Sequence, residues 1–142
     1  MGPPRLMRVV LDSNILLSAL LSPHGPPHRI YDAWRQRRFQ LVTADVQIEE
    51  LRRASRYAKF RDILKPHRVG LMLNNLQDAE LLARLPDRHT AADPNDAWLL
   101  ALADVAQADY LVTGDKRSGL LARQRIGRTR MLTATSFCTV IE

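Results

Sequence analysis

Apolar positions along the chain occur in short continuous runs that alternate with longer stretches of helical spacing. Four short runs predict strands, at 8–11, 39–43, 109–113 and 130–133, the last of these at an edge of the sheet. Helical spacing predicts helices at 15–21, 26–37, 45–57, 93–107 and a last short one to Val140, with a helix or helix pair over 65–85 interrupted near Gly70. Strands separated by helices of about ten or more residues indicate an α/β fold with a central parallel β-sheet and helices on both faces.

The carboxyl ends of the strands are where such a fold places its chemistry. Asp12 follows the first predicted strand, and Asp115 follows the strand at 109–113. The two carboxylates converge if these strands are neighbours. Ordinary turn or helix-cap use is the alternative for each aspartate. Asn14 is open in the same way, either as the N-cap of the first helix or as an amide oxygen offered to the site.

Helix geometry adds Asp96 to these candidates. On the helix that starts near Asp93, the buried direction is defined by Leu99, Leu102, Ala103 and Ala106. At about 100° per residue, Asp96 lies on the flank of that buried face and is turned toward the interior. Capping is the alternative, with Asp93 as N-cap and Asp96 favourable to the helix dipole.

The helix from Asp45 carries two adjacent glutamates that the same geometry separates. Its inward direction is defined by Ile48, Leu51, Ser55 and Ala58. Glu50 lies about 100° from that direction and can reach the rim of a crevice, whereas Glu49 lies about 160° away and should face water. The alternative is that both glutamates are solvated partners of Arg52 and Arg53.

Composition and charge narrow the class of protein. With 142 residues, 46% hydrophobic and 25% charged, the chain fits one folded domain over 1–142. It has no apolar run of membrane-spanning length, the Arg5–Asn14 segment is a poor signal peptide, and Cys138 is a lone cysteine. A reducing, cytoplasmic setting and no membrane partner are therefore expected. The net charge of +6 favours a polyanionic partner, and solubility alone is the alternative.

Bringing Asp12, Glu50, Asp96 and Asp115 together requires cations or partial protonation of the carboxylates. Two like charges 4 Å apart repel by roughly 4 kcal/mol at an effective dielectric near 20. Oxygen donors of this kind suit Mg²⁺ or Mn²⁺ and disfavour zinc. Outside these four acids, 11 acidic residues remain against 21 basic ones. A metal site within a basic surface points to a nuclease.

Several segments together resemble the PIN domain family. They are 9–14, 49–51, 93–96 with 99–103, 108–115, and 132–137. The resemblance runs in consistent order from about residue 7 to 137, and it is most similar to the VapC-like toxin components of bacterial type II toxin–antitoxin pairs. It implies a PIN-like three-layer α/β/α fold. The segment Lys116–Gly119 departs from the family pattern, where relatives often carry another acid or a leucine pair.

The resemblance also implies roles for individual residues. Asp12, Glu50, Asp96 and Asp115 would bind Mg²⁺ (or Mn²⁺) and catalyse phosphodiester hydrolysis in RNA. The supporting residues would be Asn14, Thr113 and Asp93. We expect Arg52, Arg53, Arg56 and Lys116 to bind the RNA.

The expected partners are the RNA substrate, a cognate antitoxin protein and further copies of the chain as a homodimer or higher homo-oligomer. Tyr31 and Trp34 are candidate exposed anchors for the antitoxin, and a place in the core is the alternative. A non-catalytic PIN-like RNA- or protein-binding module is the alternative function. A receiver-like phosphorylation switch is less consistent with the sequence, because Asp12-Ser13-Asn14 lacks the required pair of acids.

Overall fold

The computed structural model describes residues 6–82, 85, 94–114 and 125–142. In this part of the chain, six strands form one sheet in the order β3-β2-β1-β4-β6-β5. The strands are β1 (Arg8–Leu11), β2 (Gln40–Ala44), β3 (Glu80–Leu82), β4 (Tyr110–Val112), β5 (Arg125–Ile126) and β6 (Thr129–Leu132). Every neighbouring pair is parallel except β5 with β6. The predicted α/β class with a mostly parallel sheet is confirmed.

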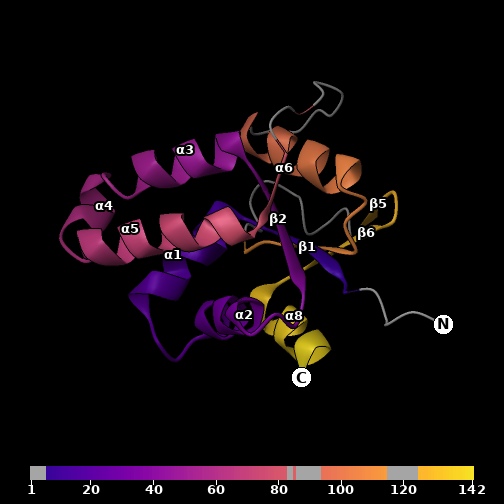
Figure 1. The fold of residues 1–142 in the computed structure, drawn as a ribbon, viewed down its shortest axis with the longest axis horizontal. Coiled ribbons are helices and arrows are strands. Elements are labelled where there is room, and N and C mark those ends of the chain that lie inside the picture. Colours follow the sequence, from indigo (N-terminus) through magenta and orange to yellow (C-terminus); the bar gives the residue numbers. More distant parts are fainter. Residues whose placement is uncertain (1–5, 83–84, 86–93, 115–124) are drawn as a thin grey trace.

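Helices cover both faces of this sheet (Figure 1). They are α1 (Ser13–Leu21), α2 (Pro26–Arg35), α3 (Asp45–Ala54), α4 (Ala58–Arg61), α5 (Pro66–Asn75), α6 (Pro94–Val105) and α8 (Ala134–Ile141), with a 3-10 turn at Leu76–Asp78. In Figure 1, α6 lies on one side of the strands and α2 and α8 lie on the other. The resulting three layers are those of the predicted α/β/α architecture. Among the described residues, we find no helix that is long and apolar enough to span a bilayer.

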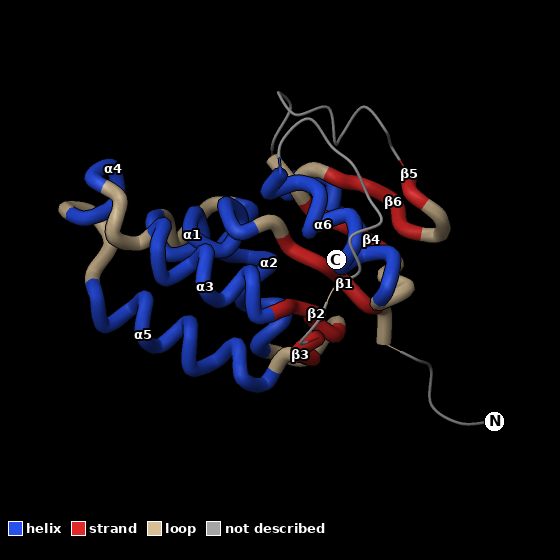
Figure 2. The backbone as a smooth tube through the Cα atoms, turned by 90° about the horizontal axis from the view of Figure 1, so that it is seen from above, coloured by secondary structure: helices blue, strands red, loops and turns tan. Residues whose placement is uncertain are grey.

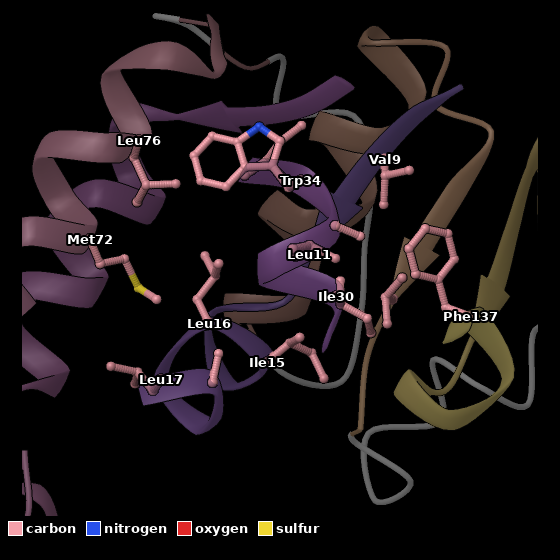
Figure 3. Close-up of a cluster of buried hydrophobic side chains, with 14 of the residues drawn as sticks. Val9, Leu11, Ile15, Leu16, Leu17, Ile30, Trp34, Met72, Leu76 and Phe137 are labelled. Carbon is pink, nitrogen blue, oxygen red and sulfur yellow. The ribbon is translucent and has the colours of Figure 1, made fainter. Parts of the chain in front are cut away.

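Successive side chains of β1 pack into two separate hydrophobic cores, because side chains on a strand point alternately to its two faces. Val9 and Leu11 pack with α1, α2 and α8, whereas Val10 packs with α6. Figure 3 shows the first of these cores, where Leu16 of α1 lies among residues from α2 and α5. Burying both faces of the strand explains why β1 is a continuous apolar run.

Two of the predicted elements were wrong. The segment 65–85 is not helical throughout, because it ends in the strand β3, and Gly70 lies inside α5 without interrupting it. β3 has only three residues and none of them is fully buried, so it is too short to show a clear apolar run or a clear alternation in the sequence. The strand at 129–132 is not an edge strand, since β6 lies between β4 and β5. Gly127, with a φ of 55°, lies in the two-residue turn that joins β5 to β6.

The aromatic pair on α2 belongs mainly to the core. Trp34 is 5% exposed, and the hydroxyl of the half-buried Tyr31 accepts a hydrogen bond from Asn75 Nδ2 at 2.8 Å. The expected exposed anchor at Trp34 is therefore wrong, and the core alternative holds. An indole offers more apolar area for burial than most side chains, and α2 packs its apolar face on the sheet side.

The thiol of Cys138, on α8, is buried as well, and this burial raises its pKa above the ordinary value.

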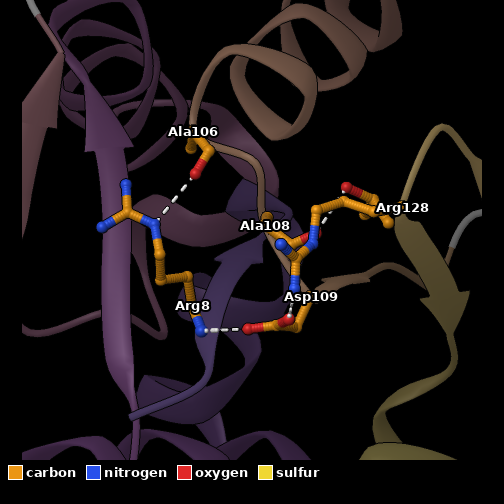
Figure 4. A network of polar contacts seen from close by, with 6 residues as sticks. Arg8, Ala106, Ala108, Asp109 and Arg128 are labelled. Carbon is orange, nitrogen blue, oxygen red and sulfur yellow. Dashed lines mark hydrogen bonds and ion pairs between the residues drawn. The ribbon is translucent and has the colours of Figure 1, made fainter. Parts of the chain in front are cut away.

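A polar network ties the amino ends of β1 and β4 together (Figure 4). The carboxylate of Asp109 accepts the backbone N–H of Arg8 at 2.8 Å and the guanidinium of Arg128 at 2.7 Å. Arg8 Nε donates to the carbonyl of Ala106, just beyond the last residue of α6. Asp109 at this amino edge is thus engaged in structural contacts, and the candidate site lies at the opposite edge.

Candidate active site

Asp12 lies at the carboxyl end of β1, next to the carboxyl end of β4. The two strands are parallel neighbours, with Leu11 opposite Val112, and the Asp12 N–H donates to the Val112 carbonyl at 2.9 Å. Asp12 Oδ2 accepts a hydrogen bond of 2.8 Å from the hydroxyl of Thr113. Both side chains are buried, with Asp12 7% and Thr113 0% exposed. The strands that Asp12 and Asp115 follow in the sequence are therefore neighbours, as convergence of the two carboxylates requires.

Asp12 also caps α1. Its Oδ1 accepts the backbone N–H of Asn14 at 3.2 Å, and its carboxylate therefore lies at the positive end of the helix dipole. The helix begins at Ser13, two residues earlier than predicted, because Asp12 is itself the N-cap, with φ −58° and ψ 144°. The prediction of Asn14 as N-cap was wrong. Asn14 is exposed in the first turn, where its supporting role remains a prediction.

Glu50 is brought toward Asp12 by α3. The helix ends at Ala54, three residues earlier than predicted, and its buried face carries Gln47, Leu51 and Ala54. Of the other residues predicted to face inward, Ile48 and Ser55 are half-buried and Ala58 is exposed. At about 100° per residue, Glu50 lies roughly 70° from the centre of that face and Glu49 roughly 170°. Accordingly Glu50 is half-buried and Glu49 exposed, as predicted. Glu50 Oε2 accepts a hydrogen bond of 3.3 Å from the hydroxyl of Ser13, the residue next to Asp12.

Gln47 and Ser13 are polar residues at this edge that the sequence analysis did not single out. Gln47 is 0% and Ser13 2% exposed. Gln47 Nε2 donates to the carbonyl of Leu11 at 2.6 Å and to Ser13 Oγ at 3.3 Å, and Gln47 Oε1 accepts from Thr43 Oγ1 at 2.6 Å. One signal was available in the sequence, because Gln47 occupies a position on the same helical stripe as Leu51 and Ala54.

The backbone of Asp96 lies in the first turn of α6. The other end of α6 is at the amino edge of the sheet, since Arg8 at the start of β1 bonds the carbonyl of Ala106. A helix of this length spans about 18 Å, so its first turn lies toward the carboxyl edge, where Asp12 lies. Asp93, Asp115 and Lys116 lie outside the described residues, and the roles predicted for them are not placed.

The donors that the structure does place are all oxygen atoms. They are the carboxylates of Asp12 and Glu50 and the hydroxyls of Ser13 and Thr113. Within the described ranges, no group of three or more histidine, cysteine, aspartate or glutamate side chains is assembled. A hard divalent ion such as Mg²⁺ or Mn²⁺ is compatible with this oxygen donor set, and the two carboxylates fit it better than they would fit zinc.

Arginines on α3 lie on two different flanks of the helix. Arg53 is on the same flank as Glu50, whereas Arg52 lies on the opposite flank. Arg52 and Arg56, together with Arg61, line a groove of about 430 Å³ between α3, α4 and α5. Figure 2 shows this helical group extending away from the strands. Arg52, Arg53 and Arg56 are all exposed, and they also line a second hollow together with Glu49. By helical phase, Arg53 is the one of the three on the Glu50 flank.

The chain is thus an α/β protein with a parallel sheet between helical layers and an acidic site, Asp12 with Glu50, at the carboxyl edge of the sheet. The family model described as PIN domain matches residues 8–117, which is more than half of the chain. The chain belongs to the PIN domain family. PIN domains are generally nucleases and typically use divalent metal ions. A search of curated proteins gave no match.

Proposed function

We propose that this protein is a Mg²⁺- or Mn²⁺-dependent ribonuclease that hydrolyses RNA phosphodiester bonds. The observation that carries the proposal is the carboxylate of Asp12, which Thr113 holds at the meeting point of two parallel strands, with Glu50 next to it through Ser13. The family supports a nuclease, and the net charge of +6 supports a polyanionic substrate.

The acidic residues would hold the metal, and the remaining groups would orient them. Asp12 and Glu50, with Asp96 and Asp115, are the proposed ligands. When bound, the ion supplies a water of lowered pKa and a positive charge against the phosphate. The hydroxyl of Thr113 fixes the rotation of the Asp12 carboxylate, and the hydroxyl of Ser13 orients Glu50.

Binding of the RNA backbone is a separate task from cleavage. Arg53 is exposed on the Glu50 flank of α3 and is suited to contact a phosphate close to the acids. Arg52, Arg56 and Lys116 complete the proposed RNA contacts. Arg52, Arg53 and Arg56 are all exposed, so a ligand in solution can reach their charges.

The biological role that we propose is that of the toxin in a bacterial toxin–antitoxin pair. The similarity of the ordered motifs to VapC-like proteins supports this role, and a cognate antitoxin is the partner it entails. We also propose that the protein works as a homodimer or higher homo-oligomer, built from one PIN domain in each chain.

Chelation tests the proposed chemistry. We expect the purified protein to cleave single-stranded RNA in the presence of Mg²⁺ or Mn²⁺, and to stop when EDTA is in excess. Adding back excess Mg²⁺ should restore cleavage, which separates loss of the ion from unfolding. Undiminished cleavage in EDTA would exclude the metal mechanism. No cleavage with either ion would favour a PIN-like binding module without catalysis.

A further inference from the structure

A chain of hydrogen bonds runs through the protein interior from β2 to the carboxylate of Glu50. It starts at the Thr43 hydroxyl, which is 2.6 Å from Gln47 Oε1, and continues through Gln47 Nε2 to Ser13 Oγ at 3.3 Å. Ser13 Oγ then lies 3.3 Å from Glu50 Oε2. Thr43 and Gln47 are both 0% exposed, so water does not compete for these contacts.

The direction of each hydrogen bond in this chain is determined by chemistry. The carbonyl of Leu11 can only accept, so the Gln47 atom 2.6 Å from it is the amide nitrogen, and the amide oxygen faces Thr43. The second hydrogen of that amide points to Ser13 Oγ. A hydroxyl has a single hydrogen, and the carboxylate of Glu50 is an acceptor, so Ser13 accepts from Gln47 and donates to Glu50.

The same amide also contacts the residues on both sides of Asp12, the backbone of one and the side chain of the other. Leu11, whose carbonyl accepts from Gln47, precedes Asp12, and Ser13, whose hydroxyl accepts from Gln47, follows it. Gln47 therefore contacts the segment that aims the Asp12 carboxylate and, through Ser13, also the carboxylate of Glu50. The two proposed metal ligands that the structure describes thus share one buried support.

We propose that Gln47 is a positioning residue for the metal site. It sets the orientation of the Ser13 hydroxyl toward Glu50 and the position of the backbone that carries Asp12. This inference rests on the proposed function, because it takes Asp12 and Glu50 as metal ligands. Hydrogen bonds that orient ligating side chains generally change metal affinity by about 10- to 100-fold when they are lost.

A purely structural role is the competing explanation for Gln47. An aliphatic side chain at this position of the α3 stripe would pack against the core, as Leu51 and Ala54 do. A purely structural amide would serve only to satisfy the Leu11 carbonyl and the Thr43 hydroxyl. Its removal would then lower stability without changing how the folded protein binds a metal ion.

The test is a calorimetric titration of the full chain with Mn²⁺ in the absence of RNA. We expect Gln47→Met, which keeps the length of the side chain, to weaken Mn²⁺ binding by about tenfold. Ser13→Ala keeps the bond from Gln47 to Leu11 but removes the donor to Glu50, and should weaken binding in the same direction. The matched control is Gln77→Met, the same substitution at an exposed position, which should leave affinity unchanged.

Thermal melting without metal separates the two roles. A Gln47→Met protein that melts at a lower temperature but binds Mn²⁺ as tightly as the wild type would overturn the inference and leave the proposed function intact. If Gln47→Met does not fold, Ser13→Ala decides, and unchanged affinity in that variant would overturn the inference as well. A wild type that binds no Mn²⁺ would instead contradict the proposed function itself.

Discussion

At the end of β1, the carboxylate of Asp12 makes two different kinds of contact. Asp12 caps α1 through the N–H of Asn14, and its other carboxylate oxygen accepts from Thr113. The cap and the candidate ligand are thus compatible in one side chain, because a carboxylate accepts several hydrogen bonds. The sequence presented them as alternatives, and only the geometry shows that capping uses one oxygen while the second faces the neighbouring strand.

Glu49 and Glu50 provide a matched pair at the scale of the residue. We expect Glu50→Gln to lower RNA cleavage on the order of 100-fold. The substitution removes the negative charge of a proposed metal ligand, and the metal ion would then be held less accurately. Glu49→Gln removes the same charge from an exposed position and should change cleavage less than about twofold. Steady-state cleavage of one labelled RNA at saturating Mg²⁺ measures both. Equal effects of the two substitutions would show that position on α3 does not matter.

Residue-level prediction succeeded where periodicity was informative. The exposure of Glu49 and the partial burial of Glu50 followed from the helical phase of α3. Gln47 was missed because a polar residue on a buried stripe becomes conspicuous only when its partners Leu11, Ser13 and Thr43 are known. Those partners come from other segments of the chain, and local sequence does not show which segments meet.

At the scale of the element, α3 has two outward flanks with different surroundings. Glu50 and Arg53 share the flank toward the end of β1, while Arg52 and Arg56 line the groove formed with α4 and α5. The sequence treated these arginines as one group. All three line one hollow with Glu49, and Arg52 and Arg56 line a second groove as well. That second groove depends on the packing of α4 and α5, and α4 has only four residues, too few for a clear periodic pattern.

Salt dependence tests the role of the Arg53 flank. If Arg53 contacts a phosphate, the slope of log affinity for single-stranded RNA against log salt should become shallower by about 0.7 in Arg53→Gln. Arg38→Gln is the matched control, because exposed Arg38 precedes β2 at the amino edge, away from the acids, and its slope should equal that of the wild type. Binding measured by fluorescence anisotropy with Ca²⁺ in place of Mg²⁺ avoids cleavage. Equal slopes in all three proteins would exclude Arg53 as a phosphate contact.

The strands with a clear apolar pattern were predicted correctly, and the strands without one were missed. β1, β2 and β4 are buried runs that the sequence indicates directly. β3 is short and partly exposed, and its place beside β2 is a tertiary contact that no local pattern shows. The position of β6 inside the sheet likewise depends on β5, a strand of two residues.

The fold of the whole molecule extends beyond the family match, which ends at residue 117. β6 pairs with β4, and the ring of Phe137 on α8 is 0% exposed and lies 5.4 Å from the ring of Phe39. The closing segment therefore completes the sheet and contributes to both cores, Phe137 to one and Met131 to the other. The α/β/α class was predictable from alternating patterns, whereas the pairing that brings these distant segments together was not.

The two edges of the sheet carry acidic residues to which we assign different roles. Asp109 precedes β4 at the amino edge and bonds Arg8 and Arg128, while Asp12 follows β1 at the carboxyl edge. Catalysis is assigned only to the carboxyl edge, where open parallel sheets place their ligands. A comparison of the same chemical change at both edges therefore tests the whole account.

The most direct measurement is Mg²⁺-dependent RNA cleavage by the wild type, Asp12→Asn and Asp109→Asn, each verified as folded by circular dichroism. Asparagine still caps a helix, so Asp12→Asn should stay folded yet lose cleavage by at least about 100-fold. Asp109→Asn should lose about 1–3 kcal/mol of stability but keep cleavage within about threefold of the wild type. Wild-type cleavage that persists in Asp12→Asn, or that disappears in folded Asp109→Asn, would contradict the assignment of the active site to the carboxyl edge.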